Sequence, residues 1–396
     1  MTKSKDHSTF SSGEVFTVAG GHLFHDLYTS FLAPLLPLLI DKLSLSLTMA
    51  GALSTLVRLP SVLNPLLGYI ADHTGALYFI IFTPGLTGTA FSLLGSAPST
   101  YTLGFLLLMA GLSSAMFHSV SPALTGKISG SQVGLGMSFF MAGGGLGRAA
   151  GPLLVVWALA RWNLAGTWRL MMIGWVVSLF LFWQLRGMVL GSQIKDTPPL
   201  RKSIPQFRSF FLPLSFILML RSFFLAAVST YLPTFMTRSG APLWIAGASL
   251  STLEIAGVAG ALTVGPISDR WGRKFTLALA MLVSGLTLFG FLQVEGWLVI
   301  PFLIVLGFFS KSTGVVFLAF VQDHFPQHRA TGNGLFMLIS FLSNALMLVL
   351  IGYIGDNLGL RPAYFIAAAL AGLTAPAIHF LPESKPRGSF EAADGT

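Results

Sequence analysis

The chain contains no cysteine and very little charge. Of its 396 residues only 9% are Asp, Glu, Lys or Arg, whereas soluble domains carry about 25%. The missing cysteine excludes a disulfide framework and any chemistry that depends on a thiol. The missing charge excludes an ordinary soluble protein. A deficit of this size requires apolar segments along the whole chain rather than one anchor helix.

Several functional motifs are also missing from the sequence. There is no phosphate-binding loop, no H-E-x-x-H sequence and no large polar domain. These absences argue against an enzyme, a receptor and an ATP-driven pump, and we expect neither a cofactor nor a metal. The N-terminal region lacks a cleavable signal pattern. The strict alternation of a membrane β-barrel is absent as well.

Apolar runs long enough to cross a bilayer, about 20 residues each, recur along the chain. The sequence predicts an all-α membrane protein with twelve transmembrane helices in two pseudo-symmetric halves of six. We expect the spans near residues 15–40, 47–71, 77–96, 100–122, 133–160, 165–187, 210–236, 243–267, 275–293, 297–321, 332–355 and 362–381. Turn residues separate them, for example Asp356 to Gly359. The longest polar stretch, 188–209, is predicted to be a cytoplasmic linker between the halves 1–187 and 210–396.

The basic residues predict the orientation of the chain. The formal net charge is +9, and most Lys and Arg lie in alternate short loops between the apolar runs. Because positive loops stay in the cytoplasm, both termini are expected to be cytoplasmic, in a multi-pass protein of the inner membrane. This placement explains the positive charge without nucleic acid, and we expect a monomer whose partners are lipid, protons and a small solute.

Two loops carry related sequences. Residues 68–75 read GYIADHTG after the second run, and residues 265–274 read GPISDRWGRK after the eighth. Gly68 and Asp72 map onto Gly265 and Asp269 with one common offset, which indicates a duplicated six-helix unit. Such halves place a substrate site at their interface, near the middle of the bilayer.

The second loop resembles the motif G-x-x-x-D-R-x-G-R-K of the major facilitator superfamily, in which it latches the halves in one state of alternating access. The resemblance implies a latch role for Gly265, Asp269, Arg270 and Arg273, and through the repeat for Gly68 and Asp72. The first copy has lost the basic residues. The alternative for both loops is a plain positively charged cytoplasmic connection.

The fifth run contains Gly143, Gly147 and Gly151 at intervals of four residues, followed by Pro152. Small residues at this spacing make a smooth face for helix packing, and proline adds a bend. The run resembles the antiporter motif of the superfamily, although Leu153 and Leu154 replace two further glycines; the alternative is a packing face alone. Together with GGHLFHDLYTSFLAPLLPLL and FHSVSPALTG in the first and fourth runs, it resembles the fosmidomycin-resistance type of drug exporters.

Ionisable residues inside a membrane are costly and therefore functional candidates. The apolar runs contain nine: His22, His25, Asp26, Arg58, His118, Arg148, Arg221, Glu254 and Lys311. All nine fall on the helices that line the central cavity in the superfamily, and none on its peripheral helices. The cations outnumber the acids, which favours an anionic substrate, and arginine forks suit a phosphonate or carboxylate.

These residues receive roles on that basis. We expect substrate binding by Arg58, Arg148, Arg221, Lys311 and Tyr28, and proton coupling by Asp26, Glu254, His22, His25 and His118. Structural alternatives remain: Asp26 could pair with Arg58, His22 could only hydrogen-bond Asp26, and Arg148 could lie in a helix interface. The leading hypothesis is a proton-coupled exporter of small anionic or amphiphilic compounds, an antiporter of the efflux type; the alternative is a proton-coupled importer of an organic anion.

Overall fold

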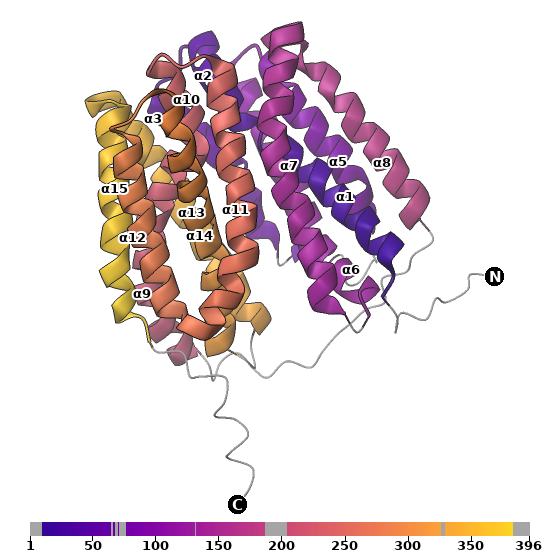
Figure 1. Cartoon of the computed structure of the whole chain (residues 1–396). Helices are drawn as coiled ribbons and strands as arrows, with labels where there is room; N and C mark the ends of the chain where they lie inside the picture. The colour runs from indigo at the N-terminus through magenta and orange to yellow at the C-terminus, as the bar shows by residue number, and fades with distance from the viewer. Residues whose placement is uncertain are drawn as a thin grey trace, which may run out of the picture. The chain divides into compact units, whose positions relative to one another are not determined.

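The computed structural model describes residues 10–64, 66–67, 70, 77–130, 132–186, 204–325 and 329–382 (Figure 1). These residues form helices joined by short turns, and no strand occurs among them. In lipid every backbone N–H and C=O must be paired within the protein, and helices achieve this within each segment. The all-α prediction is therefore confirmed.

The helices follow the predicted apolar runs closely. In the first part of the chain they are α1 (Ser12–Thr29), α2 (Leu32–Leu43), α3 (Leu47–Leu56), η1 (Leu59–Leu63), α5 (Leu77–Ser92), η2 (Leu94–Ser96), α6 (Thr100–Ile128), α7 (Val133–Trp162), η3 (Leu164–Leu170) and α8 (Met171–Leu185). In the second part they are α9 (Ile204–Leu225), η5 (Ala226–Tyr231), α10 (Leu232–Arg238), α11 (Leu243–Trp271), α12 (Arg273–Phe291), η6 (Gly296–Leu298), α13 (Val299–His324), α14 (Arg329–Leu358), α15 (Leu360–Ala377) and η7 (Ile378–Phe380).

Several of the predicted spans are divided into shorter elements, and three of these divisions lie just before a proline. Pro34 follows the break between α1 and α2, Pro60 follows the end of α3, and Pro233 follows the π-helical turn η5. Proline has no N–H to donate to the carbonyl four residues earlier, so the helix loses a bond at that point. These three interruptions therefore lie where a proline removes a helical hydrogen bond.

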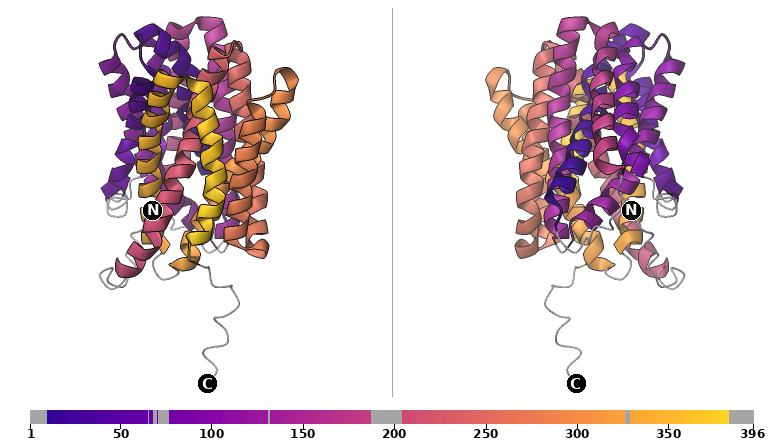
Figure 2. Two further views of the ribbon diagram at one scale, coloured as in Figure 1. Left: turned by 90° about the vertical axis from the view of Figure 1, so that its left-hand side faces the viewer. Right: turned by 90° about the vertical axis from the view of Figure 1, so that its right-hand side faces the viewer.

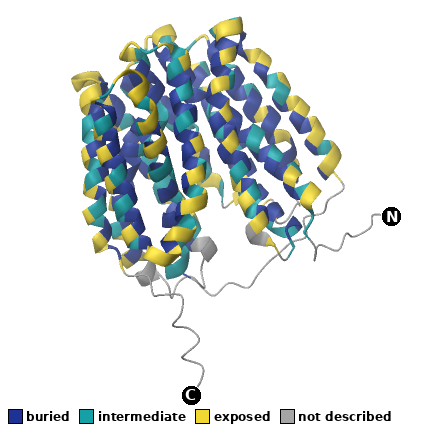
Figure 3. Ribbon diagram, viewed as in Figure 1, coloured by how far each residue is buried: buried dark blue, intermediate teal, exposed yellow. Residues whose placement is uncertain are grey.

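Eleven helices in the described part of the chain are long and apolar enough to cross a membrane, and the shorter apolar helix Leu47–Leu63 covers part of the second predicted span. Several helices carry exposed residues, which are drawn in yellow in Figure 3. On α8 the exposed residues are Met172, Trp175, Val176, Leu179, Phe180 and Trp183. Exposed apolar side chains at helical spacing are suited to lipid rather than water, so the chain is a multi-pass membrane protein.

The chain divides into two compact units. The first contains Met1–Lys195, Ala226–Ile255 and Ala345–Ala363, and the second contains Asp196–Leu225, Ala256–Asn344 and Tyr364–Thr396. In the first unit α1 lies beside α7 and α5, and α5 also lies beside α6 and α8; these are the indigo to magenta helices of Figures 1 and 2. In the second unit α12 lies beside α13. The six-plus-six division stays a prediction, because residues 187–203 of its linker lie outside the described residues.

Candidate functional site

Helices α1 and α7 meet along a row of glycines. A Cβ atom placed on Gly143, Gly147 or Gly151 would overlap the backbone carbonyl oxygens of Ala19, Leu23 and Leu27 respectively. Only residues without a side chain permit two helix backbones to approach so closely. The glycine row thus brings the polar side chains of α1 within reach of α7, and Pro152 follows the row inside α7.

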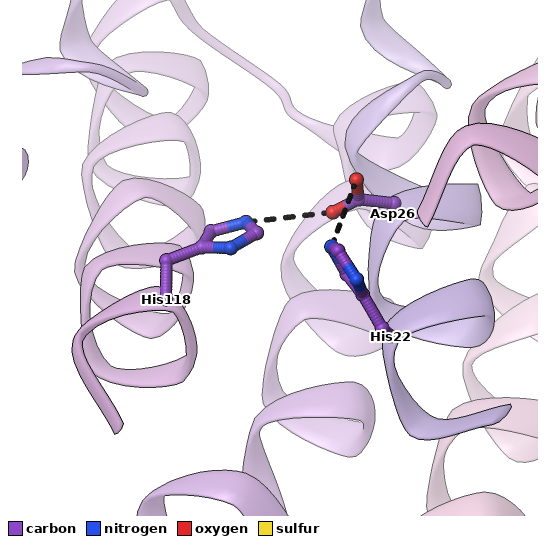
Figure 4. Close-up of side chains that lie close together, drawn as sticks. All are labelled: His22, Asp26 and His118. Atoms are coloured by element: carbon purple, nitrogen blue, oxygen red, sulfur yellow. Dashed lines mark ion pairs between the residues drawn. The ribbon is translucent and has the colours of Figure 1, made fainter. Parts of the chain in front are cut away.

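Asp26 on α1 is the centre of a buried polar cluster, and its side chain is only 5% exposed. One carboxylate oxygen, Oδ2, accepts from Nη1 of Arg148 and lies 3.3 Å from Nε2 of His22. The other oxygen, Oδ1, lies 3.5 Å from Nε2 of His118 on α6. Figure 4 shows the two imidazole rings directed at the carboxylate from two different helices. Three helices therefore contribute to this cluster.

Arg148 also contacts the second intramembrane acid. Its Nε atom lies 3.5 Å from Oε2 of Glu254 on α11, whose side chain is 9% exposed. The Arg148 side chain itself is 40% exposed, and that of His118 is 38% exposed. A single guanidinium thus joins two buried carboxylates, while the arginine and one histidine remain accessible. Attraction between such charges is much stronger away from water than in it.

The two buried histidines of α1 are held in different ways. The Nδ1 atom of His22 lies 2.7 Å from the carbonyl oxygen of Phe140. Because a carbonyl can only accept, Nδ1 carries a hydrogen, which leaves Nε2 facing Asp26 to bind or release a second proton. His25 Nδ1 lies 3.3 Å from the Thr87 hydroxyl. Its Nε2 atom is buried and has no hydrogen-bond partner among the described residues.

In the second unit, Arg221 on α9 is buried and only 8% exposed. Its Nε donates to Thr313 Oγ1 on α13 at 2.8 Å, and its Cζ lies 5.6 Å from the centre of the Phe317 ring. No carboxylate within the described part of the chain forms an ion pair with it. A buried guanidinium that contacts a hydroxyl group and an aromatic face remains able to attract an anion.

The loop between α11 and α12 is tied together by Arg273. This buried side chain contacts Asp269 one turn earlier, Ser268, and Oδ2 of Asp323 on α13, the last at 3.1 Å. Its Nη1 also donates to the Gly265 carbonyl at 3.4 Å. Arg273 therefore fixes the turn to the end of a third helix. Arg270 is exposed, and Gly68 and Asp72 of the first copy lie outside the described residues.

The sequence comparison decides the family. The profile of the Major Facilitator Superfamily matches residues 18–294 and 250–395. The chain belongs to the Major Facilitator Superfamily. Among curated proteins it is 26% identical to the fosmidomycin resistance protein of Escherichia coli (strain K12), over 95% of this chain and 94% of that protein.

Solved structures agree with this fold. The crystal structure of the nucleoside transporter NupG (D323A mutant) matches with a TM-score of 0.76 and 16% identity, covering 92% of this chain and 98% of the other. The crystal structure of a D-xylose-proton symporter matches with a TM-score of 0.74 and 16% identity, covering 94% and 98%. The superfamily consists of transport proteins, so this chain is a transporter and not an enzyme.

Two of the predicted site residues have other surroundings than expected. The alternative pair between Asp26 and Arg58 is not formed; Asp26 pairs with Arg148, and Arg58 lies half-buried at the junction of α3 and η1. Tyr28 is fully buried, and its hydroxyl donates to the Leu170 carbonyl at 2.6 Å. We therefore leave Tyr28 out of the proposed substrate site. Lys311 lies on α13, with its stem against Gly257 of α11.

The donor atoms of His22, Asp26 and His118 all lie within 4.8 Å of one another, a spacing that a metal site also requires. The Arg148 guanidinium already contacts the same carboxylate. A divalent cation bound there would meet this positive charge at short range. We therefore interpret the cluster as an ion-pair network.

Sequence reasoning missed several polar partners. The hydroxyl oxygens of Thr87 and Ser113 lie 2.7 Å apart beside His25. Thr313 accepts a hydrogen bond from Arg221, and Asp323 pairs with Arg273. Three of these residues carry hydroxyl groups, which are common in apolar helices, and Asp323 lies at the end of α13, so no spacing rule marks any of them. Only their closeness to a histidine or an arginine distinguishes them.

Proposed function

We propose that this chain is a proton-coupled exporter that moves small anionic or amphiphilic compounds by alternating access. The observation that carries the proposal is the position of Arg148, whose guanidinium contacts both Asp26 and Glu254. Proton coupling needs an acid whose charge changes the conformational equilibrium. Two acids that share one arginine provide such a device.

Proton uptake would act through the arginine. When Asp26 binds a proton, it loses its attraction for Arg148, and the guanidinium then pairs mainly with Glu254. Since Asp26 lies on α1 and Glu254 on α11, this exchange changes the attraction between these helices. His22 and His118, whose Nε2 atoms face Asp26, would carry the proton to and from it. The exposed His118 supports a role as the entry point.

Arg221 supports an anionic substrate. Its guanidinium is buried between Thr313 and Phe317 with no carboxylate paired to it among the described residues. A phosphonate or carboxylate would supply the missing negative charge, and Arg presents a planar fork that matches either group. Lys311 on the neighbouring α13 adds a second cation, and Phe317 an apolar wall.

Export is supported by the relative named as a fosmidomycin resistance protein, which matches almost the whole chain. The same cluster of charges would also serve uptake of an anion together with protons. The Lys and Arg bias predicts that both termini are cytoplasmic, and the transport assay below is oriented on that prediction.

The test is gradient-driven uptake into inverted membrane vesicles, with fosmidomycin and a series of phosphonates and organic anions as candidate substrates. A proton gradient directed as in the cell should drive accumulation of one of them. We expect Asp26→Asn to abolish this accumulation and to leave downhill exchange measurable, because the amide keeps the shape and loses the proton site.

Asp41→Asn provides the matched control, since Asp41 is an exposed acid at the end of α2. This variant should accumulate substrate like the parent protein. Accumulation that persists in both Asp26→Asn and Glu254→Gln would contradict the coupling proposal. Accumulation only in right-side-out vesicles would favour the importer.

A further inference from the structure

The first turn of α3 is capped from far along the chain. The N–H groups of Leu47 and Thr48 donate to the two carboxylate oxygens of Asp356 at 2.7 and 2.8 Å, and the Thr48 hydroxyl donates to Oδ2 at 2.6 Å. Ser46 accepts from the third N–H, that of Met49, at 3.0 Å. A helix start leaves four N–H groups without helical partners, and a residue at the end of α14 satisfies two of them.

The same end of α3 is joined to α14 and η5 by close backbone contact. A Cβ atom on Gly51 would overlap the Leu348 carbonyl, and one on Gly352 would overlap the Leu47 carbonyl. The buried Tyr231 hydroxyl lies 2.8 Å from the Leu47 carbonyl and 3.2 Å from the Leu348 carbonyl. All of these residues belong to the first compact unit. We call Leu47, Thr48, Tyr231, Leu348 and Asp356 the outer clasp.

The outer clasp lies across the membrane span from the start of α1. The chain runs from Ser12 to Leu43 through 32 residues of α1 and α2 before it reaches α3, and a helical stretch of that length spans the hydrocarbon core. With the N-terminus in the cytoplasm, as the basic residues predict, the clasp is at the outer surface. Its members Leu47 and Thr48 come from the first half of the sequence, and the other three from the second.

We propose that the outer clasp closes the outer end of the transport path in this structure and must break when the path opens to the outside. The strength of its bonds suits that role. Asp356 is exposed, so water can replace it at the α3 N-terminus when the helices separate. The buried Tyr231 and the two glycines supply the close fit that defines the closed position. The proposal rests on the proposed function only in that the protein alternates between two access states.

The experiment uses the natural absence of cysteine. Ser54 is buried on α3 and lies on the same helix face as Leu47 and Gly51. In a Ser54→Cys protein, the rate of labelling by a membrane-impermeant maleimide added outside intact cells reports opening of the outer end. Adding Asp356→Ala should raise this rate about fivefold, the factor that corresponds to the usual effect of losing a helix cap.

Ser99→Ala is the matched control. Ser99 caps the start of α6 by accepting from the N–H of Thr102. Its replacement removes a helix cap of the same kind from a helix that is not part of the outer clasp, so the labelling rate should stay at the parent value. Thr48→Val removes only the hydroxyl bond to Asp356 and should give a smaller rise than Asp356→Ala. If Asp356→Ala fails to fold, Thr48→Val decides between the outcomes.

The proposal is overturned if the labelling rate of Asp356→Ala does not exceed that of Ser99→Ala. If only Thr48→Val can be measured, the same comparison applies to it. The assay measures neither transport nor proton movement. A negative result would therefore refute the role of the outer clasp without contradicting proton-coupled export. Conversely, a failure to detect export would not change the labelling rates.

Discussion

Replacing Arg148 with methionine tests the network that carries the proposed function. Methionine keeps an unbranched stem of similar width in α7 and removes the positive charge that pairs with both Asp26 and Glu254. Removing one partner of a fully buried ion pair costs about 3–5 kcal/mol. Because 40% of the Arg148 side chain is exposed, water screens part of the attraction between these charges. We therefore expect the unfolding free energy to fall by about 2 kcal/mol.

The assay is unfolding of the purified protein in detergent, arranged as a double-mutant cycle with Asp26→Asn. The double variant should lose less than the sum of the single losses by about 1–2 kcal/mol, since each single change already breaks the shared contact. Arg161→Met, at the exposed end of the same helix, should unfold like the parent protein. Additive losses for Arg148→Met and Asp26→Asn would refute the pairing on which the coupling argument depends.

Three further outcomes follow from the same contacts. Gly147→Ala should lower the unfolding free energy by about 1–3 kcal/mol, because its methyl group meets the Leu23 carbonyl. The control is Gly20→Ala in α1, where the methyl group meets no atom within 4 Å, and its unfolding free energy should equal or exceed that of the parent protein. Asp269→Asn should slow turnover in reconstituted vesicles and largely spare substrate binding, because it weakens the hold on Arg273; unchanged turnover would remove the latch role. A cysteine at position 196 should resist labelling from outside intact cells, and labelling there would reverse the predicted topology.

The helices could be predicted from the sequence because the membrane imposes a simple rule. Each span needs an apolar run of fixed minimum length, and the runs near 77–96 and 243–267 coincide with helices of nearly the same bounds. The interruptions were not predicted, although prolines such as Pro60 mark them. A proline inside an apolar run shows where a helix bond is lost, but neighbouring helices decide whether the chain bends or breaks there.

The members of the charged cluster could be predicted, but their pairing could not. The sequence indicates that Asp26 could pair with Arg58, whereas in the structure Asp26 pairs with Arg148. Residue type and membrane depth are readable from the sequence. The rotation of each helix about its axis is set by packing, and it decides which of several cations at similar depth reaches the acid.

The glycine row determines how α7 is rotated about its axis against α1. The sequence leaves two alternatives for Arg148, a functional charge or a residue of a helix interface, and this packing makes both of them true. Gly147 immediately precedes Arg148, and the row seats α7 on α1 beside Leu23 and Leu27, which lie three residues before and one residue after Asp26. The close backbone contact therefore delivers the arginine to the acid. A helix interface and a functional charge are not competing roles at Arg148, because the interface is what positions the charge. Packing also explains the glycine at position 144. Any side chain on Gly144 would enter the space that His22 and Asp26 occupy. The cluster therefore requires a glycine there, although Gly144 contributes no charge.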